Sequence, residues 1–197
     1  MSAELLQKDS HTPQVVEQKE NFWLETLRFL AIAALIVFPI RYFIAQPFIV
    51  SGASMDPTFE NGEYLIVDQV SYRFESPARG DVIIFRYPRD TRKFYIKRIV
   101  GLPGETIEMR GSTLTIEGKD GKATTLSEPY VKNSIPQNFT ATLTDSEYFV
   151  MGDNRPSSSD SRIWGPLDRK YIVGRPVIRL FPPNKLKLFP GEELVKE

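Results

Sequence analysis

An apolar stretch near the N-terminus, from Leu27 to Ala45, constrains the fold of this 197-residue chain more than any other feature. Its Leu, Ile, Ala, Val and Phe residues are flanked by Arg28 at one edge and Arg41 near the other. At ~1.5 Å per residue, a helix of these ~19 residues would span ~28 Å, which matches a bilayer core if the arginines reach the headgroups. We therefore expect residues 22–45 to form a transmembrane anchor.

Two other structures are compatible with this apolar stretch. Its uninterrupted core, Phe29–Ile40, is also short enough for a buried helix or for the apolar region of a cleavable signal segment. A signal segment seldom follows a long, polar and partly acidic leader such as residues 1–21, which predict a flexible tail. Lys and Arg occur before the stretch but not between Gln46 and Tyr72. The positive-inside rule therefore places the N-terminus in the cytoplasm and the remainder outside.

The rest of the chain, residues 46–197, predicts a mainly β domain. Short segments rich in Val, Ile, Tyr, Phe and Thr alternate with clusters of Gly, Pro, Asn and Asp. Residues 110–146 are richer in Thr, Ser and Gly and lack large apolar runs, which is typical of a small inserted subdomain. The predicted strands are Tyr64–Val70, Asp81–Tyr87, Lys93–Val100, Thr106–Met109, Thr113–Glu117, Ala123–Leu126, Tyr148–Met151 and Arg175–Phe181.

The composition excludes several classes of chemistry. The chain has 25 Lys and Arg against 25 Asp and Glu, so its charge does not indicate a nucleic-acid partner. It contains no Cys, which excludes thiol catalysis, disulfides and Cys-based metal sites. Its single histidine, His11, lies in the polar leader, so neither a Ser-His-Asp triad nor a His metal cluster is expected. We expect no metal and no cofactor.

Ser54 is the first candidate for catalysis. It lies in the segment Ser51–Thr58, a Gly- and Pro-containing loop a few residues beyond the predicted anchor. A serine beside Gly and Pro is usually a turn former, and that reading stays open on the local sequence alone. Its position nevertheless suits a substrate that is itself held in the membrane.

Lys97 is the second candidate. It lies in an apolar, strand-like segment, where alternation places it on one face with Tyr95 and Ile99. Such neighbours disfavour the charged amine. To be half neutral at pH ~8, its pKa must fall by ~2.4 from ~10.4, which costs ~3 kcal/mol. A desolvated neutral lysine can serve as the base for a serine nucleophile. The alternative is a solvent-facing lysine paired with an acidic neighbour.

The third segment, Gly152–Arg162, is dense in residues that hydrogen-bond to backbone in tight loops. It could be a polar surface loop with solvated charges. Alternatively, it is a buried polar scaffold in which a serine orients Lys97. The scaffold would pair Asp153, Asp160, Arg98 and Arg162.

These segments together resemble type I signal peptidase, a membrane-anchored Ser-Lys protease that removes signal peptides from exported proteins. The resemblance covers residues 22–180 and follows the family's order. It implies an antiparallel β catalytic core with a small β insertion. The matching segments are Ser54–Thr58, Arg79–Phe85, Tyr95–Gly104 and Gly152–Arg162.

The resemblance also implies a role for each matching residue. Ser54 is the nucleophile, Lys97 is the general base, and Ser158 orients Lys97. Four charged residues brace the site: Arg98, Asp153, Asp160 and Arg162. Five residues line small pockets and imply cleavage after Ala-x-Ala-like sequences: Phe48, Val50, Met55, Tyr95 and Ile96.

One position departs from some family members, which carry a serine two residues before the nucleophile. Here that residue is Gly52, so we expect the backbone N–H groups of Ser54 and Gly52 to bind the oxyanion. The implied partners are membrane-bound preproteins and the lipid bilayer, with no nucleic acid, and the implied enzyme is a monomer. The implied location is the plasma membrane or another export membrane, with the catalytic domain on the trans side.

Two other functions are compatible with parts of the pattern. A self-cleaving repressor-type protease uses the same Ser-Lys chemistry, but it carries a DNA-binding domain where this chain has an apolar helix. A membrane-tethered β module could instead bind exported peptides without cutting them. Only an enzyme with an active serine should react with an acylating inhibitor.

Overall fold

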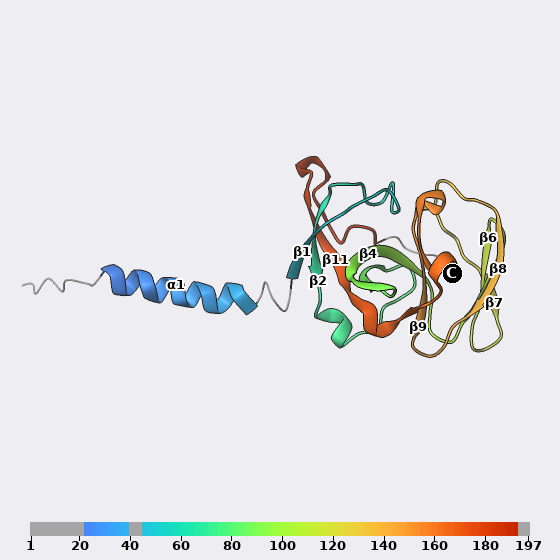
Figure 1. Ribbon diagram of the computed structural model, residues 1–197, viewed down its shortest axis with the longest axis horizontal. Coiled ribbons are helices and arrows are strands. Elements are labelled where there is room, and N and C mark those ends of the chain that lie inside the picture. Colours follow the sequence, from blue (N-terminus) through green and yellow to red (C-terminus); the bar gives the residue numbers. More distant parts are fainter. Residues whose placement is uncertain (1–21, 40–44, 193–197) are drawn as a thin grey trace, which may run out of the picture. The chain divides into compact units, whose positions relative to one another are not determined.

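In the computed structural model, residues 22–39 and 45–192 are described, and the chain divides into a first unit up to Phe38 and a second unit from Pro39. The described part of the first unit belongs to one helix, α1 (Phe22–Pro39; Figure 1), whose last residue falls in the second unit. Among the described residues, no helix combines the length and the apolar character needed to cross a membrane. The predicted tail, and residues 40–44 of the predicted anchor, lie outside the described residues. The anchor was expected to extend to Ala45, which instead begins a β-strand.

The second unit is a mainly antiparallel β domain, as the sequence predicted. Its larger sheet has eight strands in the order β1-β2-β11-β3-β4-β9-β10, with β12 paired to β11. Every pair in this sheet is antiparallel. The strands are β1 (Ala45–Ile49), β2 (Tyr64–Asp68), β3 (Val82–Tyr87), β4 (Asp90–Gly101), β9 (Glu147–Met151), β10 (Leu167–Asp168), β11 (Ile172–Phe181) and β12 (Lys187–Leu188).

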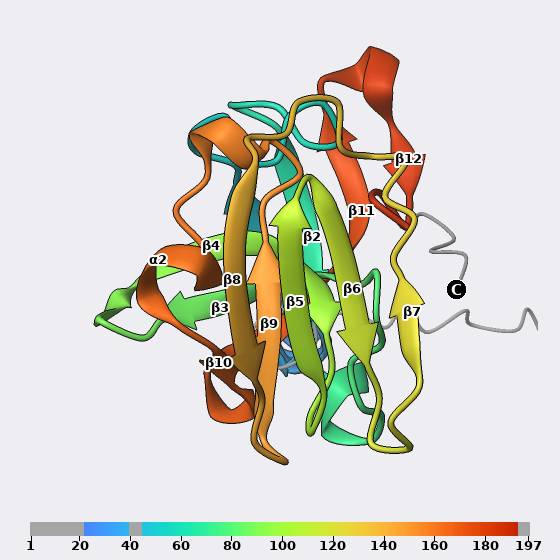
Figure 2. The ribbon, with the colours of Figure 1, turned by 90° about the vertical axis from the view of Figure 1, so that its right-hand side faces the viewer.

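A smaller, four-stranded sheet has the order β7-β6-β5-β8 (Figure 2). It starts at Thr106, before the boundary at residue 110 that the change in composition had predicted. The difference arises because Ile107 and Met109 of its first strand are buried and apolar, like strand residues of the main core. Its strands are β5 (Thr106–Gly111), β6 (Thr113–Glu117), β7 (Ala123–Thr125) and β8 (Gln137–Thr142).

An apolar cluster joins the two sheets. Ile107 and Met109 of β5 pack with Val100 of β4 and Phe149 of β9, all at most 2% exposed. Gly101 allows this close approach, because a Cβ there would lie 2.3 Å from Ile107 Cδ1. The smaller sheet is therefore fixed against the strand that carries the lysine segment.

Short helical turns complete the β domain. They are η2 (Ser71–Arg73), η3 (Arg155–Ser157), α2 (Ser161–Trp164), η4 (Arg169–Tyr171) and η5 (Pro183–Lys185). Two of these turns, η3 and α2, follow β9 directly and hold the Gly152–Arg162 segment in a compact fold.

Strand β4 pairs with its two neighbours over different lengths. It pairs with β3 from Asp90 to Arg98, whereas its ladder with β9 begins only at Arg98. Within the described residues, the first part of β4 therefore has a strand on one side only. Its other edge keeps backbone groups available to an extended peptide.

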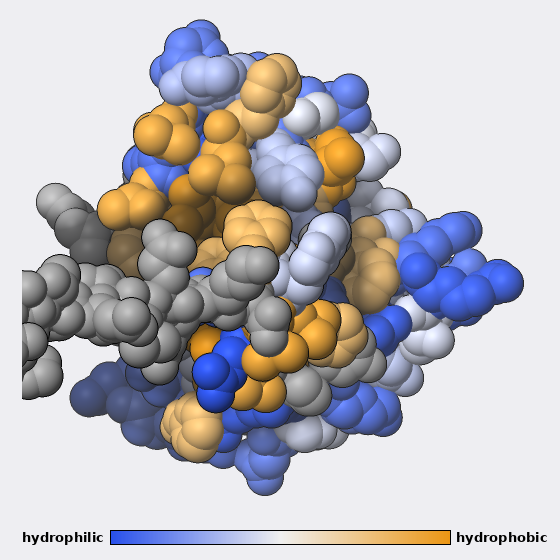
Figure 3. All heavy atoms as spheres, turned by 90° about the vertical axis from the view of Figure 1, so that its left-hand side faces the viewer, coloured by the Kyte–Doolittle hydropathy of each residue, from blue (hydrophilic) through white to orange (hydrophobic). Residues whose placement is uncertain are grey.

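Apolar side chains gather on the side of the β domain where Figure 1 shows β1, β2 and β11 (Figure 3). Large apolar side chains at or just beyond the ends of β1, β11 and β12 are 43–68% exposed. Exposed apolar side chains that gather on one face can serve as a contact surface for a partner or a membrane. These side chains are Ile49, Leu180, Phe181, Leu186, Leu188 and Phe189.

Candidate active site

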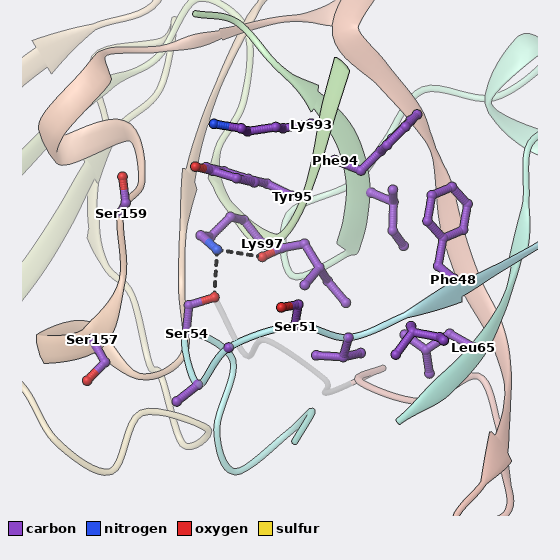
Figure 4. Close-up of a pocket in the computed structure, with 16 residues that line it drawn as sticks. Phe48, Ser51, Ser54, Leu65, Lys93, Phe94, Tyr95, Lys97, Ser157 and Ser159 are labelled. Carbon is purple, nitrogen blue, oxygen red and sulfur yellow. Dashed lines mark hydrogen bonds between the residues drawn. The ribbon is translucent and has the colours of Figure 1, made fainter. Parts of the chain in front are cut away.

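A groove of about 490 Å³ lies between the segment that follows β1 and the open edge of β4 (Figure 4). It brings together the serine and lysine segments, which are 43 residues apart in the chain. Its lining is mainly apolar, with a few hydroxyl groups and two lysines. The lining residues are Phe48, Ile49, Val50, Ser51, Gly52, Ala53, Ser54, Leu65, Ile84, Lys93, Phe94, Tyr95, Ile96, Lys97, Ser157 and Ser159.

Backbone hydrogen bonds hold the loop that carries Ser54. Val50 and Glu63 close the loop at its base, where the Val50 N–H donates to Glu63 O at 2.9 Å. At Gly52 the backbone has a φ of 93°, which favours glycine and turns the chain toward the groove. The Ser54 carbonyl accepts the N–H of Asn154 at 3.1 Å. The nucleophile candidate is thus held by a loop from the other side of the site.

The Lys97 amine and the Ser54 hydroxyl are in direct contact. Lys97 Nζ donates to Ser54 Oγ at 2.7 Å and to Ile96 O at 2.8 Å (Figure 4). Lys97 is only 4% exposed, and its amine lies 5.4 Å from the centre of the Tyr95 ring. Once the amine is neutral, its lone pair can accept the hydroxyl proton across the same distance.

The environment of Lys97 makes its neutral form much more accessible near physiological pH than that of a solvent-exposed lysine. Burial lowers the pKa of Lys97 to about 8, against the opposing effect of the Asp160 and Asp153 carboxylates. This is close to the pKa that the sequence argument required for a general base. The amine can therefore lose its proton without an extreme pH.

A fully buried ion pair lies beside the lysine. The Arg98 guanidinium donates to both carboxylate oxygens of Asp153, at 2.9 and 2.7 Å. Its remaining nitrogen donates to the carbonyls of Gly80 and Gly191, at 2.8 and 2.7 Å. Thr58, at the end of the serine segment, donates to Asp153 Oδ2 at 2.5 Å. The pair therefore links the serine segment to β4 and to the C-terminal segment.

A second buried carboxylate, Asp160, organises the other side of the loop. It accepts hydrogen bonds from Arg162 Nη2 and Ser158 Oγ, both at 2.7 Å, and from the Gly152 N–H at 3.0 Å. Burial alone would raise the pKa of Asp160, but the bonds from Arg162 and Ser158 hold it below its usual value. The carboxylate therefore stays charged at neutral pH and fixes the Ser158 hydroxyl.

The structure places most of the predicted substrate residues on the groove, with one exception. Phe48, Val50, Tyr95 and Ile96 line it, but Met55 does not. Met55 is 1% exposed and packs in an apolar cluster, because the turn after Ser54 directs its side chain into the core. The expected role of Met55 in a substrate pocket is therefore corrected.

The predicted oxyanion donors also differ in the structure. The Gly52 N–H donates to Asn61 Oδ1 at 2.9 Å, so it already has a partner and is not directed at a substrate. Sequence reasoning missed Asn61, because its contact depends on the closure of the whole loop. Among the described residues, the Ser54 N–H has no hydrogen-bond partner. Ser54 is therefore the better candidate for a backbone donor.

Sequence reasoning also missed Asn154 and Arg155, although both lie in the segment that it singled out. Asn154 Nδ2 donates to Ala53 O at 2.9 Å, next to the serine. Arg155 is 3% exposed and donates to Gly152 O at 3.0 Å. Within residues 22–39 and 45–192, no group of three or more acidic or His side chains is arranged to hold a metal ion.

The family profile and the known proteins that this chain resembles all carry the description signal peptidase. Residues 23–181 match the profile of the family described as signal peptidase, peptidase S26. The chain is 36% identical to signal peptidase I T of Bacillus subtilis, over 92% of this chain and 97% of that protein. It is 35% identical to the probable signal peptidase I-1 of Synechocystis sp., over 84% and 86% of the two chains. A crystal structure of a signal peptidase I from Enterococcus faecalis is 38% identical and covers 51% of this chain and 97% of that one, with a TM-score of 0.44.

Proposed function

The chain belongs to the signal peptidase family, peptidase S26, whose members are serine endopeptidases that cleave signal peptides, and we propose that Ser54 and Lys97 form its catalytic dyad. The observation that carries this proposal is the contact between a buried amine with a pKa of about 8 and the Ser54 hydroxyl, 2.7 Å apart on the wall of an open groove. A hydroxyl nucleophile needs such a neighbouring base.

The proposed reaction begins when neutral Lys97 takes the proton of the Ser54 hydroxyl while Oγ attacks the scissile carbonyl carbon. The Ser54 N–H stabilises the oxyanion of the tetrahedral intermediate, a contribution of ~3–4 kcal/mol per donor in other hydrolases. The C–N bond then breaks, and protonated Lys97 gives its proton to the departing amine. The signal peptide remains as an ester on Ser54. Lys97 next takes a proton from water, whose attack releases the peptide and restores the dyad.

Substrate binding uses the open edge of β4. An extended peptide adds there as a further strand, with its backbone on β4 and alternate side chains directed into the groove. The walls near Ser54 include Val50, Tyr95 and Ile96. Bulky walls leave room for small side chains, in keeping with the cleavage after Ala-x-Ala-like sequences that the family resemblance implies.

The supporting residues keep the dyad aligned. Asp160 holds the Ser158 hydroxyl, which we propose to orient the Lys97 amine during the reaction. Arg162 fixes Asp160, and the Arg98–Asp153 pair anchors the strand segment that carries Lys97. All five of these residues are proposed to act through Lys97 or Ser54 and not on the substrate.

We also propose that the protein works at an export membrane, as a monomer with its N-terminus in the cytoplasm and its β domain on the trans side. Two features support this location: the apolar sequence from Leu27 to Ala45 and the exposed apolar face around β1, β11 and β12. Protease digestion of intact and ruptured vesicles tests the topology. Digestion of the β domain from the cytoplasmic side of intact vesicles would overturn it.

Cleavage of a preprotein by the purified full-length chain tests the proposed dyad. Ser54→Ala and Lys97→Met should each lower kcat/KM by ~10³-fold or more, since each removes one member of the reacting pair. Lys122→Met, which removes a lysine from the exposed turn after β6, serves as the control and should cleave normally. Wild-type turnover by either dyad variant would refute the assignment. A non-catalytic peptide-binding module would cleave nothing and would not be acylated at Ser54.

A further inference from the structure

A segment between the two strands β7 and β8, residues 128–130, contacts the site from outside the four motif segments. The Tyr130 ring lies over the Arg98 guanidinium, 4.0 Å from ring centre to carbon. The Glu128 carboxylate accepts hydrogen bonds from both terminal nitrogens of Arg155, one of them at 3.1 Å. The Tyr130 hydroxyl donates to the same carboxylate at 3.0 Å.

Glu128 is connected to the nucleophile through a short series of hydrogen bonds. Arg155 Nε donates to Gly152 O at 3.0 Å, which closes the turn between them. Asn154, inside that turn, donates its N–H to Ser54 O and its side-chain amide to Ala53 O. The carbonyls of Ala53 and Ser54, which flank the Ser54 side chain, are thus held by a turn whose shape depends on Arg155.

The charge balance makes Glu128 necessary for that turn. The Arg155 side chain is 2% exposed and the Glu128 side chain 11%. Among the described residues, Glu128 is the only acidic group that forms an ion pair with Arg155. A buried guanidinium without a counter-charge is strongly disfavoured, so without Glu128 the Arg155 side chain would move toward solvent and release Gly152 O.

We propose that Glu128 is a positioning residue for catalysis, which sets the direction of the Ser54 hydroxyl through Arg155 and Asn154. The proposal rests on the proposed function, because it assumes that Ser54 is the nucleophile. Glu128 itself touches neither the substrate nor the reacting atoms. A shift of ~1 Å in a reacting group can cost ~100-fold in rate, so loosening the turn should impair the chemical step.

The test is Glu128→Gln, which keeps the size of the side chain and removes its charge. Its kcat for preprotein cleavage should fall ~10- to 100-fold with little change in KM, because the groove itself is not altered. The rate of Ser54 acylation by a serine-reactive inhibitor should fall in parallel. Unchanged kcat in a folded Glu128→Gln variant would overturn the proposal.

Glu105→Gln is the matched control. Glu105 forms a similar pair with Arg79, with two hydrogen bonds at 2.7 and 2.9 Å and side chains 11% and 12% exposed. It lies just before the smaller sheet, and in the described part of the chain its carboxylate accepts hydrogen bonds from Arg79 and from the Leu102 N–H, not from residues 152–155. At a temperature where both variants are folded, Glu105→Gln should keep its kcat. An equal loss in both variants would show a general structural effect and would refute a positioning role.

A double-mutant cycle with Asn154→Ala separates the proposed route from other effects. If Glu128 acts through Asn154, then Glu128→Gln should reduce kcat less in the Asn154→Ala protein than in the wild type. Additive losses would refute the route. Should Glu128→Gln fail to fold, Glu128→Asp, which keeps the charge on a shorter side chain, must show the same coupling.

Comparing Ser54→Ala with Glu128→Gln distinguishes failure of the positioning role from failure of the proposed dyad. If Ser54→Ala cleaves normally, the dyad is wrong, whatever Glu128 does. If Ser54→Ala is inactive and folded Glu128→Gln is fully active, the dyad stands and the positioning role is wrong.

Discussion

The free energy spent on burying the Lys97 amine should appear as a pH dependence of stability that Lys97→Met removes. Lys97 is 4% exposed, and its pKa falls from 10.5 to about 8 in the folded protein, mainly through desolvation. At neutral pH the amine is mostly charged in both the folded and the unfolded chain, so the folded state carries most of the desolvation cost. Methionine has a similar shape and no charge, so it carries none.

The size and sign of the effect follow from proton linkage. A shift from 10.5 to about 8 is a difference of about 2.5 pKa units, each worth ~1.36 kcal/mol, which gives ~3 kcal/mol in total. Between about pH 8 and about pH 10.5 the unfolded chain binds more protons than the folded chain, so the free energy of unfolding rises with pH. The wild type should therefore gain ~3 kcal/mol relative to Lys97→Met from about pH 7 to about pH 10.5.

Urea denaturation of both proteins, followed by tryptophan fluorescence at a series of pH values, measures this difference. From about pH 7 to about pH 10.5 the two proteins differ in titration chiefly at Lys97, and the hydrogen bonds lost in Lys97→Met change the difference in unfolding free energy by a constant. A difference that does not change with pH would refute the reasoning, since it would mean that the amine keeps an ordinary pKa. If the free energies of unfolding of the wild type and Lys97→Met instead approach each other as the pH changes below 7, a group other than Lys97 causes the effect.

Three further variants test the surroundings of the dyad. Asp153→Asn leaves the fully buried Arg98 without its counter-charge and should lower the free energy of unfolding by ~3–5 kcal/mol in urea denaturation. Gly152→Ala should prevent acylation of Ser54, as judged by inhibitor labelling, because the added Cβ would lie 2.3 Å from Ser54 O. A chain that ends before Gly191 should lose ~1–3 kcal/mol of stability, because an Arg98 nitrogen loses its carbonyl acceptor.

Each of these variants has a control of the same kind. Asp145→Asn, in the exposed pair with Lys119, should leave urea denaturation unchanged. Gly121→Ala strains a positive-φ turn in the smaller sheet but should leave Ser54 labelling intact. A chain that ends after Glu192 keeps the Gly191 carbonyl and should be as stable as the full chain. A control that loses as much stability or Ser54 labelling as its test variant would refute the corresponding prediction.

Much of the β domain could be predicted from local patterns. Each predicted strand overlaps an observed one, because apolar runs bounded by Gly, Pro, Asn and Asp mark strands that face a core. Four strands were not predicted: β1, β8 and the two-residue strands β10 and β12. The first two lack the apolar runs that marked the others. Gln46 and Pro47 interrupt β1, and β8 alternates between exposed and half-buried residues. Both lie at the edge of a sheet and form mainly through backbone pairing, which leaves little trace in composition.

The parts of the candidate site that depend on the type of a residue and its sequence neighbours could be predicted. The parts that depend on contacts between distant segments could not. A lysine flanked by Tyr95 and Ile99 already indicated desolvation. The pairing of Glu128 with Arg155 did not follow from the sequence, because ion pairs between distant segments have no local signal. Met55 was misplaced for a related reason, since its direction is set by the turn and not by its neighbours in sequence.

The most direct test of the dyad is the pH dependence of Ser54 acylation, measured by mass spectrometry with a serine-reactive inhibitor. We expect labelling on Ser54, at a rate that rises with pH through a midpoint at about 8 as Lys97 loses its proton. Lys97→Met should abolish that rise. Labelling at another residue, or a rate that is flat from about pH 6 to about pH 10 in the wild type, would contradict the account.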